Sequence, residues 1–103
     1  DMVFDARFLR NPHYVPELRD FTGRDAAVGE YIAADPGFAG FLGGITSLVE
    51  PLLPRFVEEG KHYLTIAIGC TGGRHRSVYT AERLAAHLRE AGHAVELRHR
   101  EVG

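Results

Sequence analysis

Hydrophobic residues along the chain follow the spacings of both strands and helices. Apolar and polar positions alternate loosely over residues 2–8, which predicts a short strand. Residues 63–68 are almost continuously apolar and rich in strand-forming types, as expected for a strand covered on both faces. A last strand is predicted over residues 94–100, after Gly92. The pattern therefore contains three strands separated by longer segments.

Two of the intervening segments predict helices with recognisable ends. Thr22 and Asp25 resemble a capping box ahead of a short helix that reaches about residue 34. Another helix is predicted from about residue 75 to residue 91, because small and large apolar residues recur there every three or four positions. Gly92 is a natural stop for this last helix.

The clearest helical pattern of the first half covers residues 38–60, with apolar residues at three-and-four spacing throughout. Pro51 and Pro54 are expected to kink this helix or divide it in two. The order is strand, helices, strand, helix, strand. It predicts an α/β fold in which helical crossovers connect the strands of a small, mostly parallel sheet.

Composition agrees with one globular domain over residues 1–103, with 45% apolar and 25% charged residues. Residues 1–60 carry 5 basic and 10 acidic side chains, whereas residues 61–103 carry 7 and 4, so an anionic ligand is expected at the second half. No apolar stretch is long enough to span a membrane. The single cysteine suits a reducing, cytoplasmic location. Because the chain begins at Asp1 directly before a strand pattern, we expect it to be part of a longer protein.

The candidate chemistry lies in a glycine-rich loop between the strand at 63–68 and the following helix. Ligands of open α/β sheets bind at the carboxyl ends of strands, and a helix start favours anions. Glycines allow main-chain N–H groups to converge, and arginine side chains hydrogen-bond phosphate oxygens. We therefore predict an anion-binding site, against the alternative of a plain turn with surface arginines. Its residues are Cys70, Thr71, Gly72, Gly73, Arg74, His75 and Arg76.

Known nucleotide-binding patterns do not fit this loop, since Gly73-Arg74-His75 replaces the Gly-Lys-Ser/Thr ending of a P-loop and the dinucleotide spacing fails. Metal ligation is not expected, because Cys70 has no second cysteine beside it. Cys70, five residues, and then Arg76 match the loop of cysteine-dependent phosphatases. That mechanism needs an acid for the leaving group, for which the candidates are Asp5, Asp20 and Asp25.

Three separated blocks resemble the C-terminal domain of the RapZ/YvcJ family, known as RNase adapter or nucleotide-binding proteins of bacteria. The blocks are FDARFLRNPHYVPELRDFTGRD, YLTIAIGCTGGRHRSVYTAERLA and the closing Arg98-His99-Arg100. The resemblance implies a non-catalytic domain that senses glucosamine-6-phosphate and helps to present a small regulatory RNA to an endoribonuclease. It also implies two-component regulators as partners, homo-oligomers, and no cofactor in this domain. ATP and GTP would bind only in an N-terminal domain outside this chain.

The resemblance adds a second set of ligand residues to the glycine-rich loop, namely Asp5, Arg7, Asn11, His13 and Arg19. Asp5 is the best partner for the ammonium group of an amino sugar, although Asp5 and Arg7 could instead form a structural ion pair. Arg98 and Arg100 are candidates for RNA contact, but acidic residues alternate with the basic ones and the lysine-rich tail of RNA-binding relatives is missing. The sequence thus leaves three functions open: a phosphosugar sensor, a cysteine-dependent phosphatase and an RNA-binding module.

Overall fold

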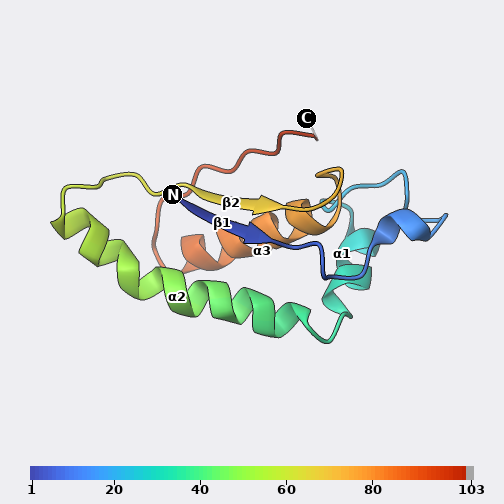
Figure 1. Ribbon diagram of the computed structural model, residues 1–103, viewed down its shortest axis with the longest axis horizontal. Coiled ribbons are helices and arrows are strands. Elements are labelled where there is room, and N and C mark those ends of the chain that lie inside the picture. Colours follow the sequence, from blue (N-terminus) through green and yellow to red (C-terminus); the bar gives the residue numbers. More distant parts are fainter. Residues whose placement is uncertain (102–103) are drawn as a thin grey trace.

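Two short parallel strands form the sheet of this protein, whose computed structural model describes residues 1–101. The predicted α/β class is confirmed (Figure 1). In chain order the elements are β1 (Met2–Asp5), the 3₁₀ turn η1 (Pro12–Tyr14), α1 (Ala26–Ala33), α2 (Phe38–Glu58), β2 (Ile66–Gly69) and α3 (Arg76–Glu90). Met2 pairs with Ile66 and Asp5 with Gly69, so both strands end at the same edge of the sheet.

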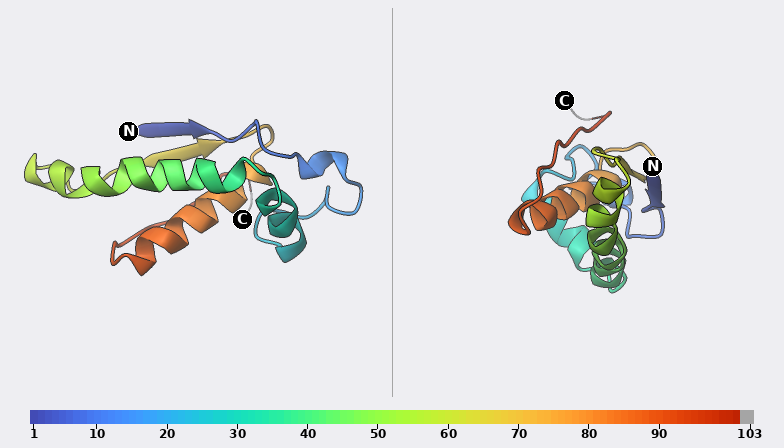
Figure 2. Two further views of the ribbon diagram at one scale, coloured as in Figure 1. Left: turned by 90° about the horizontal axis from the view of Figure 1, so that it is seen from below. Right: turned by 90° about the vertical axis from the view of Figure 1, so that its left-hand side faces the viewer.

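The two strands are covered on one face, which corrects the prediction of a strand buried on both faces. Met2 and Phe4 of β1 and Ile66 and Ile68 of β2 pack against a cluster built by α2 and α3. Figure 2 shows these two helices on the same side of β1. Side chains alternate between the faces of a strand, so Val3 points the other way and is 79% exposed. The continuous apolar run therefore reflects strand-forming residues rather than double burial.

The core consists of two adjoining clusters that position the ends of the strands. Buried residues of one cluster come from the segment after β1, from α1 and from the start of α2: Ala6, Leu9, Val28, Ile32 and Phe38. The other joins α2 to α3 through Ile45, Val49, Leu84 and Leu88. Phe41, Leu42 and Ile68 contact both clusters, so the strand ends and all the described helices are held by one continuous apolar interior.

Of the two effects expected of Pro51 and Pro54, a kink or a division, the division is wrong, because α2 runs as one helix from Phe38 to Glu58. A proline removes the hydrogen bond to the carbonyl four residues earlier, here the carbonyls of Ser47 and Glu50. Pro51 and Pro54 are themselves exposed. On an exposed face water can hydrogen-bond such carbonyls, and the buried side of the helix keeps packing through Val49 and Leu53.

The predicted strand over residues 94–100 is also wrong, because this segment is irregular in the structure. It is held by side chains instead of a main-chain ladder. Val95 packs against the α2–α3 cluster, and its carbonyl accepts a hydrogen bond from Arg89. The buried side chain of His99 hydrogen-bonds Glu82 of α3 at 2.9 Å. These contacts place the segment beside α3 without strand pairing.

The turn before α1 forms half of the expected capping box. The Asp25 carboxylate accepts the main-chain N–H of Thr22 at 2.7 Å, whereas the Thr22 hydroxyl accepts from Arg24 rather than from Asp25. Helix α1 then begins at Ala26. Within residues 1–101, no single helix has the length and apolar character to cross a membrane; α1 and α2 pass that test only as a pair bent by 89°.

Candidate functional site

The candidate site begins where the two parallel strands end side by side. The Ala6 N–H donates to the Gly69 carbonyl at 2.7 Å, which extends the pairing of β1 with β2 by one hydrogen bond. The glycine-rich loop leaves β2 at Cys70, and the first predicted block leaves β1 at Ala6. The two segments that carry the predicted ligand residues therefore start from adjacent positions, although more than 60 residues separate them in the chain.

Positive φ angles at two adjacent glycines shape the loop between β2 and α3. Gly72 has a φ of 81° and Gly73 a φ of 66°, a region that other residues rarely adopt. A Cβ atom at Gly73 would also stand 2.8 Å from Cγ of Glu101. The turn thus depends on glycine for its backbone at both positions and for space at Gly73.

Two adjoining cavities lie over this loop, and Thr71 lines both. The larger has a volume of about 510 Å³ and is lined by Asn11, His13, Tyr14, Arg19, Asp20, Thr71, Gly72, Arg74 and His75. The smaller has a volume of about 380 Å³ and is lined by Val3, Phe4, Asp5, Arg7, Gly69, Cys70 and Thr71. We call them the basic cavity and the Asp5 cavity.

The structure brings ten of the twelve predicted ligand residues to these two cavities, while Gly73 and Arg76 line neither. Sequence reasoning missed Tyr14 of the basic cavity and named Asp20 only as a candidate acid, not as a ligand residue. Both directly follow a predicted ligand residue, so their place in the same segment, residues 11–20, was the available signal. Arg98 and Arg100, the candidates for RNA contact, line neither cavity; Arg98 pairs with Glu96 at 2.6 Å.

In the basic cavity, the side chains of two arginines and of one of the two histidines are anchored to main-chain carbonyls. Arg19 Nε donates to the His13 carbonyl at 2.8 Å, and Arg74 Nη2 donates to the Asp20 carbonyl at 3.1 Å. The buried His75 ring hydrogen-bonds the Arg19 carbonyl through Nε2 at 3.1 Å. Among residues 1–101 these two arginines form no ion pair with a carboxylate, although Asp20 also lines the cavity, so positive charge remains there to attract anions.

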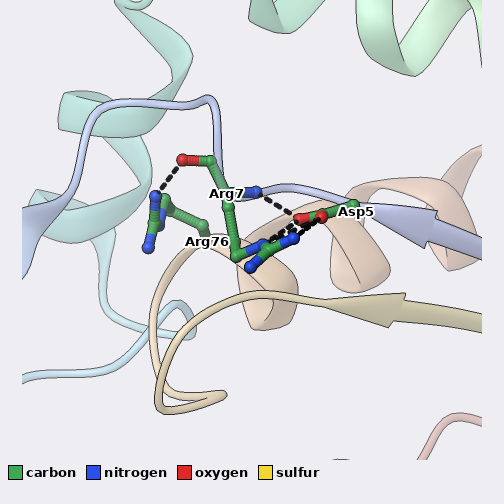
Figure 3. A network of polar contacts seen from close by, with 3 residues as sticks. All are labelled: Asp5, Arg7 and Arg76. Carbon is green, nitrogen blue, oxygen red and sulfur yellow. Dashed lines mark hydrogen bonds and ion pairs between the residues drawn. The ribbon is translucent and has the colours of Figure 1, made fainter.

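In the Asp5 cavity, Asp5 and Arg7 form the ion pair that the sequence left as an alternative (Figure 3). Arg7 donates from Nε at 2.8 Å and from Nη2 at 2.6 Å to the same carboxylate oxygen, and its main-chain N–H donates to the other at 2.9 Å. These hydrogen bonds lower the pKa of Asp5, the side-chain bonds most of all. Asp5 is therefore an ionised acceptor near neutral pH.

Cys70 lies beside Ser77 at the first turn of α3. The Ser77 N–H donates to Cys70 Sγ at 3.3 Å, and Sγ lies 3.2 Å from the Ser77 hydroxyl oxygen. Burial raises the pKa of the Cys70 thiol, but the Ser77 hydroxyl, the N–H groups of Ser77 and Gly73, and the charge of Arg76 lower it by more. The net effect is a pKa below the ordinary value, so the loop stabilises a negative charge at this point.

Arg76 is buried, with 5% of its surface exposed. Its Nη1 atom donates to the Arg7 carbonyl (Figure 3) and to the Leu9 carbonyl at 3.2 Å. Because Nη1 is bonded to these two carbonyls, Arg76 does not present its whole guanidinium group to the open loop. Arg76 joins the start of α3 to the segment after β1.

These features define an α/β domain with a basic cavity at the carboxyl ends of its strands, and within residues 1–101 no cluster of metal-ligating side chains accompanies it. Residues 1–103 match the model of the RapZ C-terminal domain, and the chain belongs to that family.

Relatives agree with this assignment. The chain is 67% identical over 102 residues to a nucleotide-binding protein of Paramagnetospirillum magneticum, covering 99% of the chain and 33% of that relative. It is 62% identical over 102 residues to a nucleotide-binding protein of Rhodospirillum rubrum, again covering 99% of the chain but 32% of the relative. The chain thus spans about a third of the length of the curated relatives that it matches.

Proposed function

We propose that this domain is a non-catalytic, regulatory domain that binds a phosphorylated amino sugar, glucosamine-6-phosphate. One observation carries the proposal: a cavity rich in arginine and histidine adjoins a cavity with an ionised carboxylate, and Thr71 lines both. A phosphate group suits the first cavity because its arginines bond to main-chain carbonyls and form no ion pair in the part of the chain that the structure describes. An ammonium group suits the second, where Asp5 is the acceptor.

The Asp5–Arg7 ion pair is compatible with an ammonium ligand. Three N–H groups of Arg7 make four hydrogen bonds to the Asp5 carboxylate, which has about four acceptor positions, so an ammonium group would share these oxygens with Arg7. The pair is also exposed, with 53% of the Asp5 side chain accessible. Asp5 thereby serves as the residue that distinguishes an amino sugar from a neutral one, while Arg7 keeps the carboxylate ionised and in place.

Calorimetric titration with three ligands tests the proposal. Glucosamine-6-phosphate should bind most tightly, glucose-6-phosphate should lose the contribution of the ammonium group, and glucosamine should lose that of the phosphate. The Asp5→Asn variant should bring the affinities for glucosamine-6-phosphate and glucose-6-phosphate together. His13→Ala should weaken both phosphates, whereas His62→Ala, an exposed histidine outside both cavities, should weaken neither. Absence of binding by any of the three ligands would refute the proposed function.

For the complete protein, the proposal extends to what the family resemblance implies. Nucleotide binding, to ATP or GTP, is assigned to the portion of the protein outside this chain, in line with the names of the relatives. A small regulatory RNA, an endoribonuclease or two-component regulators, and further copies of the protein are the proposed partners, in the cytoplasm. RNA would meet Arg98 and Arg100 and would have to displace Glu96 from Arg98. Salt-dependent RNA binding that weakens in an Arg98→Ala, Arg100→Ala variant tests this part.

The lowered pKa of Cys70 favours a second candidate, a cysteine-dependent phosphatase. In that reaction the thiolate forms a bond to phosphorus while the ester P–O bond breaks and the leaving oxygen takes a proton. The acid is the difficulty: Asp5 lines the same cavity as Cys70, but its lowered pKa makes it a poor donor. Phosphate release from p-nitrophenyl phosphate that is lost in Cys70→Ser would support this candidate. If the wild-type protein releases no phosphate, the phosphatase is refuted and the sugar-phosphate sensor remains.

A further inference from the structure

Three consecutive basic residues at the end of the glycine-rich loop all reach the main chain of the first block. Arg74 donates to the carbonyl of Asp20, His75 to that of Arg19, and Arg76 to those of Arg7 and Leu9. All four carbonyls belong to the segment 7–20, which we call the covering segment. A main-chain hydrogen bond from Gly23 to Arg74 closes its far end at 2.8 Å.

Arg76 and His75 are both buried, each with 5% of its surface exposed. Of the three residues, Arg76 is the one that bonds to the beginning of the covering segment. A buried guanidinium is costly unless its N–H groups have partners, so the two carbonyls and Arg76 stabilise one another. Ala6 and Leu9 on either side of the bonded stretch lie in the core. Arg76 thus fixes the turn that carries Arg7 toward the Asp5 cavity and continues toward Asn11 and His13 at the basic cavity.

We propose that Arg76 is a positioning residue: it sets the covering segment in register with the glycine-rich loop, so that the side chains recognising the sugar stand opposite the groups recognising the phosphate. The inference rests on the proposed function. Loss of the two carbonyl bonds should disturb Asp5, Asn11 and His13 as a set. The side-chain hydrogen bonds of Arg76 run to the Arg7 and Leu9 carbonyls, so the main chain of Thr71–Gly73 should remain able to hold an anion. Arg76 then governs which ligand binds rather than whether an anion binds.

The test compares inorganic phosphate with glucosamine-6-phosphate by calorimetry on the whole chain. Arg76→Lys keeps the charge but cannot bridge two carbonyls in the same geometry. We expect the dissociation constant for glucosamine-6-phosphate to rise about tenfold or more, as for loss of a hydrogen bond to a charged group, while that for inorganic phosphate changes little. Arg83→Lys, an exposed position on the same helix, is the matched control and should change neither.

Parallel weakening of both ligands in Arg76→Lys would overturn the inference, since it would mean that Arg76 contacts the phosphate directly. Unchanged affinity for both would overturn it as well. If wild-type protein binds no sugar phosphate, the proposed function fails, and hydrogen exchange then decides the positioning role separately. Arg76→Lys should raise exchange of amides in residues 9–23 and leave those of α2 unchanged. Exchange that rises everywhere, or nowhere, would contradict positioning of this segment.

Discussion

Gly23 lies directly against the main chain of Tyr79: a Cβ atom at Gly23 would stand 2.4 Å from the Tyr79 nitrogen. The turn that follows the covering segment is therefore in backbone contact with α3, at a position where only glycine fits. The same glycine donates its N–H to the Arg74 carbonyl. A single methyl group at Gly23 would therefore collide with the first turn of α3.

Gly23→Ala should destabilise the protein by about 1–3 kcal/mol, as overpacking of a tight contact does. Urea unfolding measures the difference in free energy. Gly40→Ala is the matched control, because a Cβ there meets nothing within 4 Å and lies on an exposed helix position. The control should be neutral or more stable by about 0.5–1 kcal/mol through helix propensity. Equal effects of the two substitutions would show that the close contact at Gly23 does not form.

Alkylation of Cys70 should depend on pH with a midpoint below the ordinary value of a cysteine thiol. The thiolate is the reacting form, and hydrogen bonds from Ser77 favour it in the folded protein. Ser77→Ala removes the hydroxyl and should move the midpoint upward, whereas Ser47→Ala on the exposed face of α2 should not. The rate of iodoacetamide reaction at a series of pH values measures both. An unshifted midpoint in the wild-type protein would contradict the expectation.

Asp35 should make the folded protein lose stability in acid. Its carboxylate accepts the N–H groups of Gly37 and Arg10, each at 2.8 Å, and these bonds lower its pKa. A carboxyl group with a lowered folded-state pKa contributes stability above its unfolded pKa, and the contribution disappears as the pH falls through the folded value.

The thermal midpoint of Asp35→Asn should therefore lie below that of the wild-type protein at neutral pH, and the two should converge in acid. Glu17→Gln is a suitable control because Glu17 is exposed and has no hydrogen bond to the described residues. Melting curves followed by circular dichroism over a range of pH values give the comparison. A difference that stays constant down to the most acidic pH would argue against the assigned hydrogen bonds.

Ile32→Ala should lower the free energy of unfolding by about 2–5 kcal/mol. Ile32 of α1 is fully buried in the cluster that α1 forms with the start of α2, and the smaller side chain leaves a cavity. Val57→Ala removes apolar atoms from a side chain that is 56% exposed, and the effect should stay within about 0.5 kcal/mol. Chemical denaturation of both variants tests whether the core is placed as the structure has it. Similar losses for the two would contradict that placement.

Much of the local structure followed from the sequence because its causes are local. The periodicity of residues 38–58 and 76–90 and the glycines that follow them predicted α2 and α3 closely. The two adjacent glycines of the loop also marked the position where positive φ angles occur. Predictions failed where contacts between distant parts of the chain, or exposure to solvent, outweighed a local sequence preference. Pro51 and Pro54 lie on an exposed side of α2, and residues 94–100 find side-chain partners on α3 in place of a strand neighbour.

The sequence by itself determined the order of the strands and helices as far as α3, the loop at the carboxyl end of β2 and the residue types gathered around it, since these depend on spacing and composition over short stretches. Only the tertiary structure decided that Asp5 pairs with Arg7. It also decided that the side chains of Arg74, His75 and Arg76 bond to carbonyls of the covering segment. The bonds from the loop to these carbonyls join residues more than 50 positions apart, as Arg76 and Arg7 are. Their geometry depends on how α3 and the strands pack, and no pattern along the chain contains that information.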